Sequence, residues 1–284
     1  MSSAQSGRQA RDGTSLRLGV SLNFVQHKSV TAEGVQAVAR SSIETLEVPG
    51  AFLADPAQRE LIMRYLTVPT GPRVVSVHSP FSEAIDISRT DPGGAEQGIE
   101  AARAALKAGS ELGARLLVIH PSAEPIVPEQ RAARIERSRA SLAALAAPAR
   151  AARCRIAVEL LPRTCLGNTA EELALLLDGL DERVFGVCLD TNHLMERHAS
   201  LPQVLGALGR RLFTLHLSDY DGVDEKHWMP GKGVIDWPAF MGALREIGYG
   251  GPFNYEADPQ VPELDARIAA FGRNFAWLSG LGKG

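Results

Sequence analysis

Eight short apolar segments alternate with longer Ala- and Leu-rich segments of helical periodicity, and this alternation limits the possible fold most strongly. The apolar segments are nearly continuous, which is typical of parallel strands buried on both faces. We expect strands at residues 16–23, 43–48, 74–78, 116–120, 156–160, 185–190, 212–217 and 252–256. We expect helices at residues 31–40, 56–66, 95–112, 129–152, 169–179, 201–210, 237–247 and 262–280. Eight βα units in 284 residues predict an α/β fold, a single (β/α)8 TIM barrel.

An open doubly wound sheet is the alternative fold with the same alternation. Such a sheet usually carries a glycine-rich phosphate turn after its first strand, and NFVQHK at residues 23–28 contains no glycine. We therefore expect one barrel domain over residues 16–284. The polar segment at residues 1–15 is expected to be a disordered tail.

Charge and cysteine content narrow the class of protein. A net charge of −3 argues against a protein that mainly grips a phosphate backbone, so nucleic acid is not an expected partner. Three cysteines without a CxxC pair indicate free thiols in a reducing compartment. No apolar run approaches the roughly 18 residues that span a bilayer. We expect a cytoplasmic protein without membrane attachment.

Side chains that bind metals or transfer protons lie at seven of the eight expected strand ends: Glu47, His78, His120, Glu159, Asp190, His216 and Glu256. The whole chain has only 7 histidines and 33 acidic residues, so this placement is far from random. A barrel gathers the carboxyl ends of its strands at one face. Carboxylates and imidazoles without thiolates suit a borderline divalent ion, and a buried cluster of such charges needs a cation.

The segment DTNHLM at residues 190–195 adds His193, which can face the same site as Asp190 if the chain turns helical there. The segment HLSDYDGVDEKHWMPGKG at residues 216–233 adds His227 and four acidic residues.

Within this second segment, we expect Asp219 and Asp221 to lie behind the site or to face solvent. Trp228 either contacts the substrate or packs against the protein, and the sequence does not decide between these roles. Lys232 between two glycines is a weak candidate for a phosphate contact. Glu47 is a further weak candidate for substrate contact.

Together these residues resemble the xylose-isomerase-like barrels, which include sugar-phosphate isomerases and epimerases and endonuclease IV. The resemblance runs from about residue 16 to 280 and rests on the motifs AVEL, CLDTNH, LHLSD, HWMPGKGVIDW and NYEA. Ketose epimerases of this group hold one divalent ion with ligands from strands five to eight. The resemblance implies that the metal ligands here are Glu159, Asp190, His216 and Glu256.

The resemblance also implies a reaction. The two glutamates, Glu159 and Glu256, would act as acid and base, and His193 would hydrogen-bond a substrate oxygen. We therefore expect a divalent-metal-dependent isomerase or epimerase that acts on a sugar, sugar phosphate or related polyol ketone through an enediolate. Mn²⁺ is the ion we favour, and Mg²⁺, Co²⁺, Fe²⁺ and Zn²⁺ also suit the ligands. The expected partners are a small carbohydrate-like substrate and, in a homo-oligomer, further copies of the chain.

Two departures separate the chain from a plain ketose 3-epimerase. Where those epimerases carry another glutamate after strand five, this chain has Cys165, and LSDYDGV lacks the arginine that follows their strand-seven histidine. A metal-dependent dehydratase that acts on a keto-inositol keeps the four ligands and is one alternative.

The other alternative is a multi-zinc phosphoester hydrolase of the endonuclease IV type. Such enzymes use histidines at strands three and four and an Asp-x-His after strand seven. Glu225 falls at the position of that aspartate, with Asp224 one residue earlier. The imidazole positions are matched by His78, His120, His193 and His227. With Glu225, these histidines are expected to contact substrate or to hold a second metal.

Overall fold

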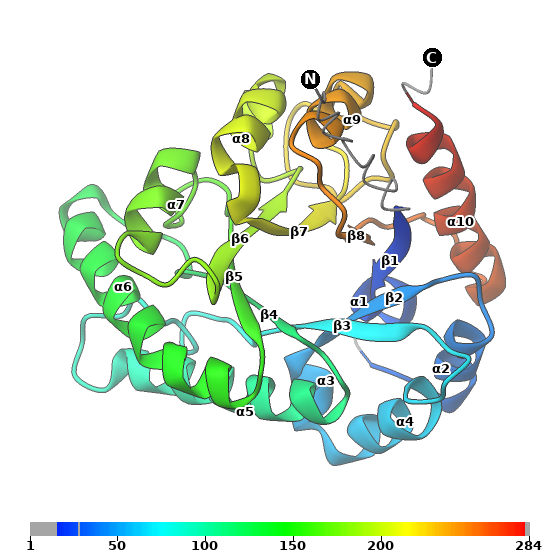
Figure 1. The fold of residues 1–284 in the computed structure, drawn as a ribbon, viewed down its shortest axis with the longest axis horizontal. Helices are drawn as coiled ribbons and strands as arrows, with labels where there is room; N and C mark the ends of the chain where they lie inside the picture. Colours follow the sequence, from blue (N-terminus) through cyan, green and yellow to red (C-terminus); the bar gives the residue numbers. More distant parts are fainter. Residues whose placement is uncertain (1–15, 28, 282–284) are drawn as a thin grey trace, which may run out of the picture.

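A computed structural model describes residues 16–27 and 29–281, where eight parallel strands close into a ring inside a layer of helices (Figure 1). The strands are β1 (Arg17–Ser21), β2 (Thr45–Pro49), β3 (Arg73–His78), β4 (Leu116–Ile119), β5 (Arg155–Glu159), β6 (Phe185–Asp190), β7 (Leu212–Leu217) and β8 (Pro252–Tyr255). Each strand pairs with its sequence neighbours, and β1 pairs with β8 to close the ring. The predicted TIM barrel is confirmed. The expected tail at residues 1–15 lies outside the described residues, as do residues 282–284 of the expected domain.

The longer helices cover the outside of the ring and agree closely with the expected segments (Figure 1). They are α2 (Ala32–Ala39), α4 (Pro56–Leu66), α5 (Gly94–Glu111), α6 (Pro128–Ala151), α7 (Ala170–Leu177), α8 (Leu201–Leu208), α9 (Trp237–Glu246) and α10 (Leu264–Gly280). Side-chain caps fix several starts: Thr31, Thr169 and Asp236 each accept a hydrogen bond from a backbone N–H of the first turn.

Several short elements near the strand ends differ from the expectation. The first expected strand, 16–23, stops at Ser21, and the chain continues into α1 (Leu22–Gln26). A second short helix, α3 (Gly50–Ala54), follows β2 directly. After β6, residues 191–194 form a turn that leads into the 3₁₀ helix η1 (Met195–Ser200), and a second 3₁₀ turn, η2 (Gly209–Arg211), precedes β7. Helices of five residues are too short to show a helical period.

The apolar core has a large part between strands and helices and a small part inside the ring. The inner cluster consists of Leu116, Val118, Ala157 and Cys188, with Phe213 packed against it. Side chains two residues apart on a strand share a face. The inner cluster therefore lies directly below the residues that end these strands. Within the described ranges, no helix is both long and apolar enough to cross a membrane.

Candidate metal centre

Four of the expected residues meet at the carboxyl ends of β5 to β8. Glu159, Asp190, His216 and Glu256 each offer one ligand atom, and these four atoms lie within 4.8 Å of one another. The Nδ1 atom of His216 is 3.2 Å from Oε1 of Glu159 and 3.4 Å from Oε2 of Glu256. Strand register places Asp190 directly beside His216. When two ligand atoms bind the same ion at about 2.0–2.2 Å, they lie roughly 3 Å from each other, which is close to the separations found here.

The carboxylate of Asp190 gives a direct test of whether this group fits a cation. Its Oδ1 atom accepts a hydrogen bond from the backbone N–H of Asn192 at 2.8 Å. Its Oδ2 atom is buried and accepts no hydrogen bond from any described residue. The Nε2 atom of His193 lies 3.6 Å from Oδ2, beyond hydrogen-bond distance, and a buried oxygen without a hydrogen bond is costly. The carboxylates of Asp190, Glu159 and Glu256 and the imidazole of His216 fit a divalent cation such as Mn²⁺.

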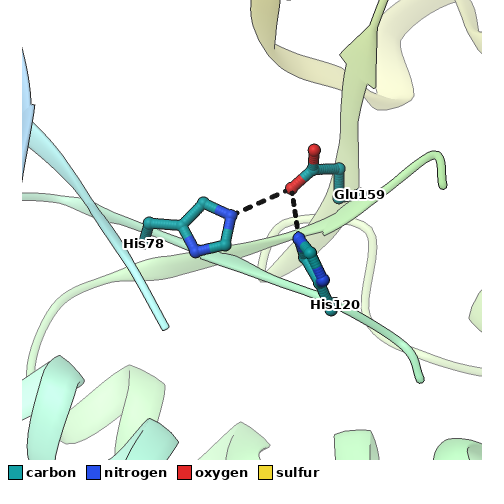
Figure 2. A group of neighbouring side chains, drawn as sticks. All are labelled: His78, His120 and Glu159. Atoms are coloured by element: carbon teal, nitrogen blue, oxygen red, sulfur yellow. Dashed lines mark hydrogen bonds and ion pairs between the residues drawn. The ribbon is translucent and has the colours of Figure 1, made fainter. Parts of the chain in front are cut away.

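A second group shares Glu159 with the first. The Nε2 atoms of His78 and His120 lie 3.1 and 3.3 Å from the same Oε2 atom of Glu159, and Figure 2 shows both rings directed at it. The Nδ1 atom of His78 donates to the carbonyl of Ser79 at 2.9 Å, which fixes the ring. Burial opposes charge on His78, but the hydrogen bond and charge of Glu159 outweigh it and raise the pKa of His78 to about 9. For His120, burial prevails and lowers the pKa.

A third group lies on the other side of Asp190. The Nε2 atoms of His193 and His227 are 3.3 and 3.1 Å from Oε1 of Glu225. Each ring donates its Nδ1 hydrogen to a backbone carbonyl at 2.8 Å, that of Leu160 or of Glu256. A ring held in this way directs Nε2 into the site. All four expected histidines therefore face the mouth of the barrel.

The acidic residue before Glu225 has a different role. Asp224 pairs with Arg163 at 2.7 Å instead of with the histidines. Arg163 also pairs with Glu225 at 3.0 Å.

The pKa values of the two glutamates of the central group, Glu159 and Glu256, shift in opposite directions. Burial alone would raise the pKa of Glu159, but the charges of His216 and His120 outweigh it and hold the pKa well below its usual value. Burial raises the pKa of Glu256; His216 opposes this shift, and the charges of Glu47 and Glu159 add to it. Two carboxyl groups whose pKa values are driven apart can serve as a base and an acid.

Glu47 occupies a different place from the one expected. Because β2 continues to Pro49, Glu47 lies inside the strand, fully buried and off the cavity wall. Its Oε1 atom is 3.0 Å from Nε2 of His216, and its Oε2 atom accepts a hydrogen bond from Ser76 at 2.8 Å. A carboxylate behind a metal-binding histidine orients the ring and raises its basicity. The structure therefore places Glu47 at ion-pair distance from the ring of His216 and not among the residues that line the cavity.

A cavity of about 650 Å³ opens above these groups, within the range of roughly 300–1,000 Å³ of small-molecule sites. Its wall includes three aromatic side chains that we did not single out: Phe24 from α1, Phe52 from α3 and Phe81 after β3. Phe81 stacks on His120 with ring centroids 3.8 Å apart. Each of these three phenylalanines follows an expected strand within a few residues, and this position in the sequence could have indicated a place on the cavity wall. Arg163 also lines the cavity and was missed.

Two weaker candidates lie elsewhere. Trp228 and Lys232 line a separate hollow with Asp258 and are not on the wall of the main cavity. Asp219 is fully buried behind the site, where its carboxylate accepts hydrogen bonds from Gly231, Ile235 and Trp237.

The family of xylose isomerase-like TIM barrels matches residues 35–279. The chain belongs to this family. Membership agrees with the resemblance seen in the strand-end motifs and with the closed ring of eight strands.

Several relatives in this family have a named activity. An inosose isomerase of Bacillus subtilis (strain 168) is 28% identical over 158 residues, covering 52% of this chain and 57% of that protein. A ketose 3-epimerase of Arthrobacter globiformis is 25% identical over 247 residues, covering 84% of this chain and 82% of that protein. This chain spans less than two thirds of the length of several curated relatives, the inosose isomerase among them.

Solved structures show the same fold. A D-tagatose 3-epimerase-like protein superposes with a TM-score of 0.76 at 21% identity, covering 93% of this chain and 98% of that chain. At this identity the likeness concerns the fold alone.

Proposed function

We propose that this protein is a divalent-metal-dependent isomerase or epimerase of a sugar, a sugar phosphate or a related polyol ketone. The observation that carries the proposal is the group of Glu159, Asp190, His216 and Glu256, in which the buried Oδ2 atom of Asp190 accepts no hydrogen bond from a described residue. Two members of the group, Glu159 and Glu256, line the cavity. The named activities of the B. subtilis and A. globiformis relatives agree with it.

The four residues would hold a divalent ion, which supplies positive charge to stabilise an oxyanion that develops beside the reacting carbon. Glu159, whose pKa is depressed, is charged and suited to remove a proton from the carbon next to a carbonyl. Glu256, whose pKa is raised, is suited to return a proton to the enediolate. The aromatic side chains of the cavity wall and the buried position of the group would limit the access of water to the reacting carbon.

The metal content and the reaction can be tested together. Purified protein is analysed for metal equivalents per chain, and then incubated with Mn²⁺ and a panel of ketoses, aldoses, their phosphates and inositol ketones. We expect about one equivalent of a divalent metal and exchange of a carbon-bound hydrogen with deuterium from D₂O, read by NMR. Loss of water from an inositol ketone instead would identify the dehydratase alternative. A metal-loaded protein without hydrogen exchange on any member of the panel would contradict the proposal.

A specific observation favours a second candidate function. The groups of His78, His120 and Glu159 and of His193, Glu225 and His227 each bring three potential ligand atoms within 4.8 Å. Together with the central group, they could hold more than one ion. Two metal ions side by side stabilise the attacking and leaving oxygens of a phosphoester in hydrolysis. Two or three zinc equivalents per chain, with cleavage of abasic DNA or bis(p-nitrophenyl) phosphate, would establish this hydrolase in place of the isomerase.

A further inference from the structure

The end of the barrel opposite the metal centre has a strongly basic cavity. A hollow of about 460 Å³ lies at the amino ends of the strands, and we call it the basal cavity. Four arginines line it: Arg17 at the start of β1, Arg115 before β4, Arg155 at the start of β5 and Arg210 before β7. None of its lining residues is acidic, although the whole chain carries a net charge of −3.

These four guanidinium groups have no counterion in the part of the chain that the structure describes. None of them forms an ion pair with a described carboxylate. The Nε atom of Arg17 is buried and donates to no described acceptor. By contrast, several arginines on the helices form ion pairs, as Arg137 does with Glu96 and Arg131 with Glu172. Arg115, Arg155 and Arg210 are exposed and Arg17 is half-buried, so solvent screens much of their repulsion, and a bound anion would offset the rest.

Two of the four arginine side chains are held in place by contacts with neighbouring groups. The guanidinium of Arg155 lies 4.1 Å from the ring centroid of Phe213, and a nitrogen of Arg115 donates to the carbonyl of Ala114 at 3.1 Å. An arginine that is fixed by stacking or by a backbone contact keeps its remaining N–H groups free for a bidentate contact with phosphate oxygens.

We propose that the basal cavity binds a small phosphate-bearing anion. Its volume is larger than a phosphate ion needs, so it accommodates either inorganic phosphate or the phosphate end of a small metabolite. The site is separate from the metal centre, because its arginines lie at the starts of strands whose opposite ends carry the metal-binding residues. The proposal does not depend on which reaction the metal centre performs.

A competing role for these arginines has a different consequence. The carboxyl ends of the outer helices lie at this end of a βα barrel, and arginines there offset the partial negative charge of the helix ends. In that role the arginines would contribute to stability but would not select a phosphate ion over other anions.

Isothermal titration calorimetry of the metal-loaded protein, at an ionic strength held constant with NaCl, tests the proposal. The probes are inorganic phosphate, pyrophosphate and ribose 5-phosphate. The variants are Arg17→Gln, Arg155→Gln and Arg210→Gln, with Arg64→Gln on α4 as the control that removes the same charge elsewhere. We expect saturable binding to the wild type and to the control, and binding about tenfold weaker in each basal variant, as for a lost charged hydrogen bond.

The relative affinity for the three probes shows whether the occupant is the free ion or a phosphorylated metabolite. If Arg17→Gln does not fold, as judged by circular dichroism, Arg210→Gln still decides the result, because Arg210 is exposed and its side chain forms no hydrogen bond or ion pair with the described residues. Equal affinity of the wild type and the folded basal variants, or no saturable binding by the wild type, would overturn the proposal.

Discussion

At the scale of single residues, Glu159 and Glu256 are the side chains on which the proposed proton transfer depends. Replacing either with Gln keeps its size but removes the group that accepts or returns the proton. Since acid–base catalysis contributes about 10²–10⁴-fold, we expect kcat to fall by at least about 100-fold in each variant. Steady-state kinetics measures this fall, and Glu246→Gln at the exposed end of α9 is the control. Full turnover by either active-site variant, with its fold intact, would refute the assignment.

Asp219 holds the long segment that connects β7 to α9. Its carboxylate accepts hydrogen bonds from the backbone of Gly231 and Ile235 at 2.7 and 3.1 Å and from the indole of Trp237 at 2.8 Å. Removing it leaves buried donors without partners, at a cost of about 1–3 kcal/mol each. We expect Asp219→Ala to lower the free energy of unfolding by about 3 kcal/mol or more in urea denaturation. We expect Asp221→Ala, at a partly exposed position nearby, to change it far less.

Cys165 gives an expected pH dependence. Burial raises the pKa of its thiol to about 12. Because the folded chain binds this proton more tightly than the unfolded chain, the stabilisation is complete below about pH 8.5 and is lost as the pH rises toward 12. In Cys165→Ala, the free energy of unfolding should therefore decline less steeply between about pH 8.5 and 10 than in the wild type. Identical slopes in urea titrations of the two proteins would contradict this assignment.

Most residues of the candidate site could be expected to lie together from the sequence, because the carboxyl end of a parallel strand in a barrel has a known position. It could not separate Glu47 from the others, since the side chain lies below the mouth because β2 ends at Pro49, one residue later than expected. Nor could it show that Glu225, and not Asp224, reaches the histidines, because that choice depends on the conformation of a long loop.

At the scale of elements, Arg163 ties the segment after β5 to the segment between β7 and α9. It pairs with Asp224 at 2.7 Å and with Glu225 at 3.0 Å, and its side chain is 38% exposed. For partly exposed pairs we expect Arg163→Gln to reduce stability by no more than about 1 kcal/mol. Its main effect should be faster amide hydrogen exchange over residues 218–236.

Arg150→Gln is the matched control, because Arg150 forms a similar exposed pair with Asp181 at 3.0 Å on the far side of α6. Unchanged exchange over residues 218–236 in Arg163→Gln, or the same acceleration in Arg150→Gln, would show that the ion pairs do not hold the segment.

The eight strands were predicted from their nearly continuous apolar segments, and the longer helices from an apolar periodicity that extends over several turns. The helices α1 and α3 were not, although they carry Phe24 and Phe52 to the cavity wall. Each begins directly after a strand and has only five residues, so its sequence looks like a continuation of the strand or a loop.

At the scale of the whole molecule, metal binding should stabilise the fold. The central group is a concentration of buried carboxylates, and a cation that binds only the folded chain adds stability by mass action, about 4 kcal/mol at 1,000 times the dissociation constant. We expect the midpoint of thermal unfolding of chelator-treated protein to rise with added Mn²⁺ in calorimetry. Asp190→Asn should weaken this response, whereas Asp178→Asn, exposed at the end of α7, should leave it unchanged. A midpoint that does not depend on Mn²⁺ would exclude a metal centre of this kind.

The pairing of β1 with β8 has a consequence for how the protein behaves when concentrated. Since each strand has a hydrogen-bonded neighbour on both sides, the barrel over residues 16–27 and 29–281 offers no open strand edge to which another chain could add. Intermolecular sheet growth must then begin from molecules in which the ring has opened. The rate of aggregation should accordingly follow the population of unfolded chains, and conditions that keep the ring closed should also keep the protein dispersed.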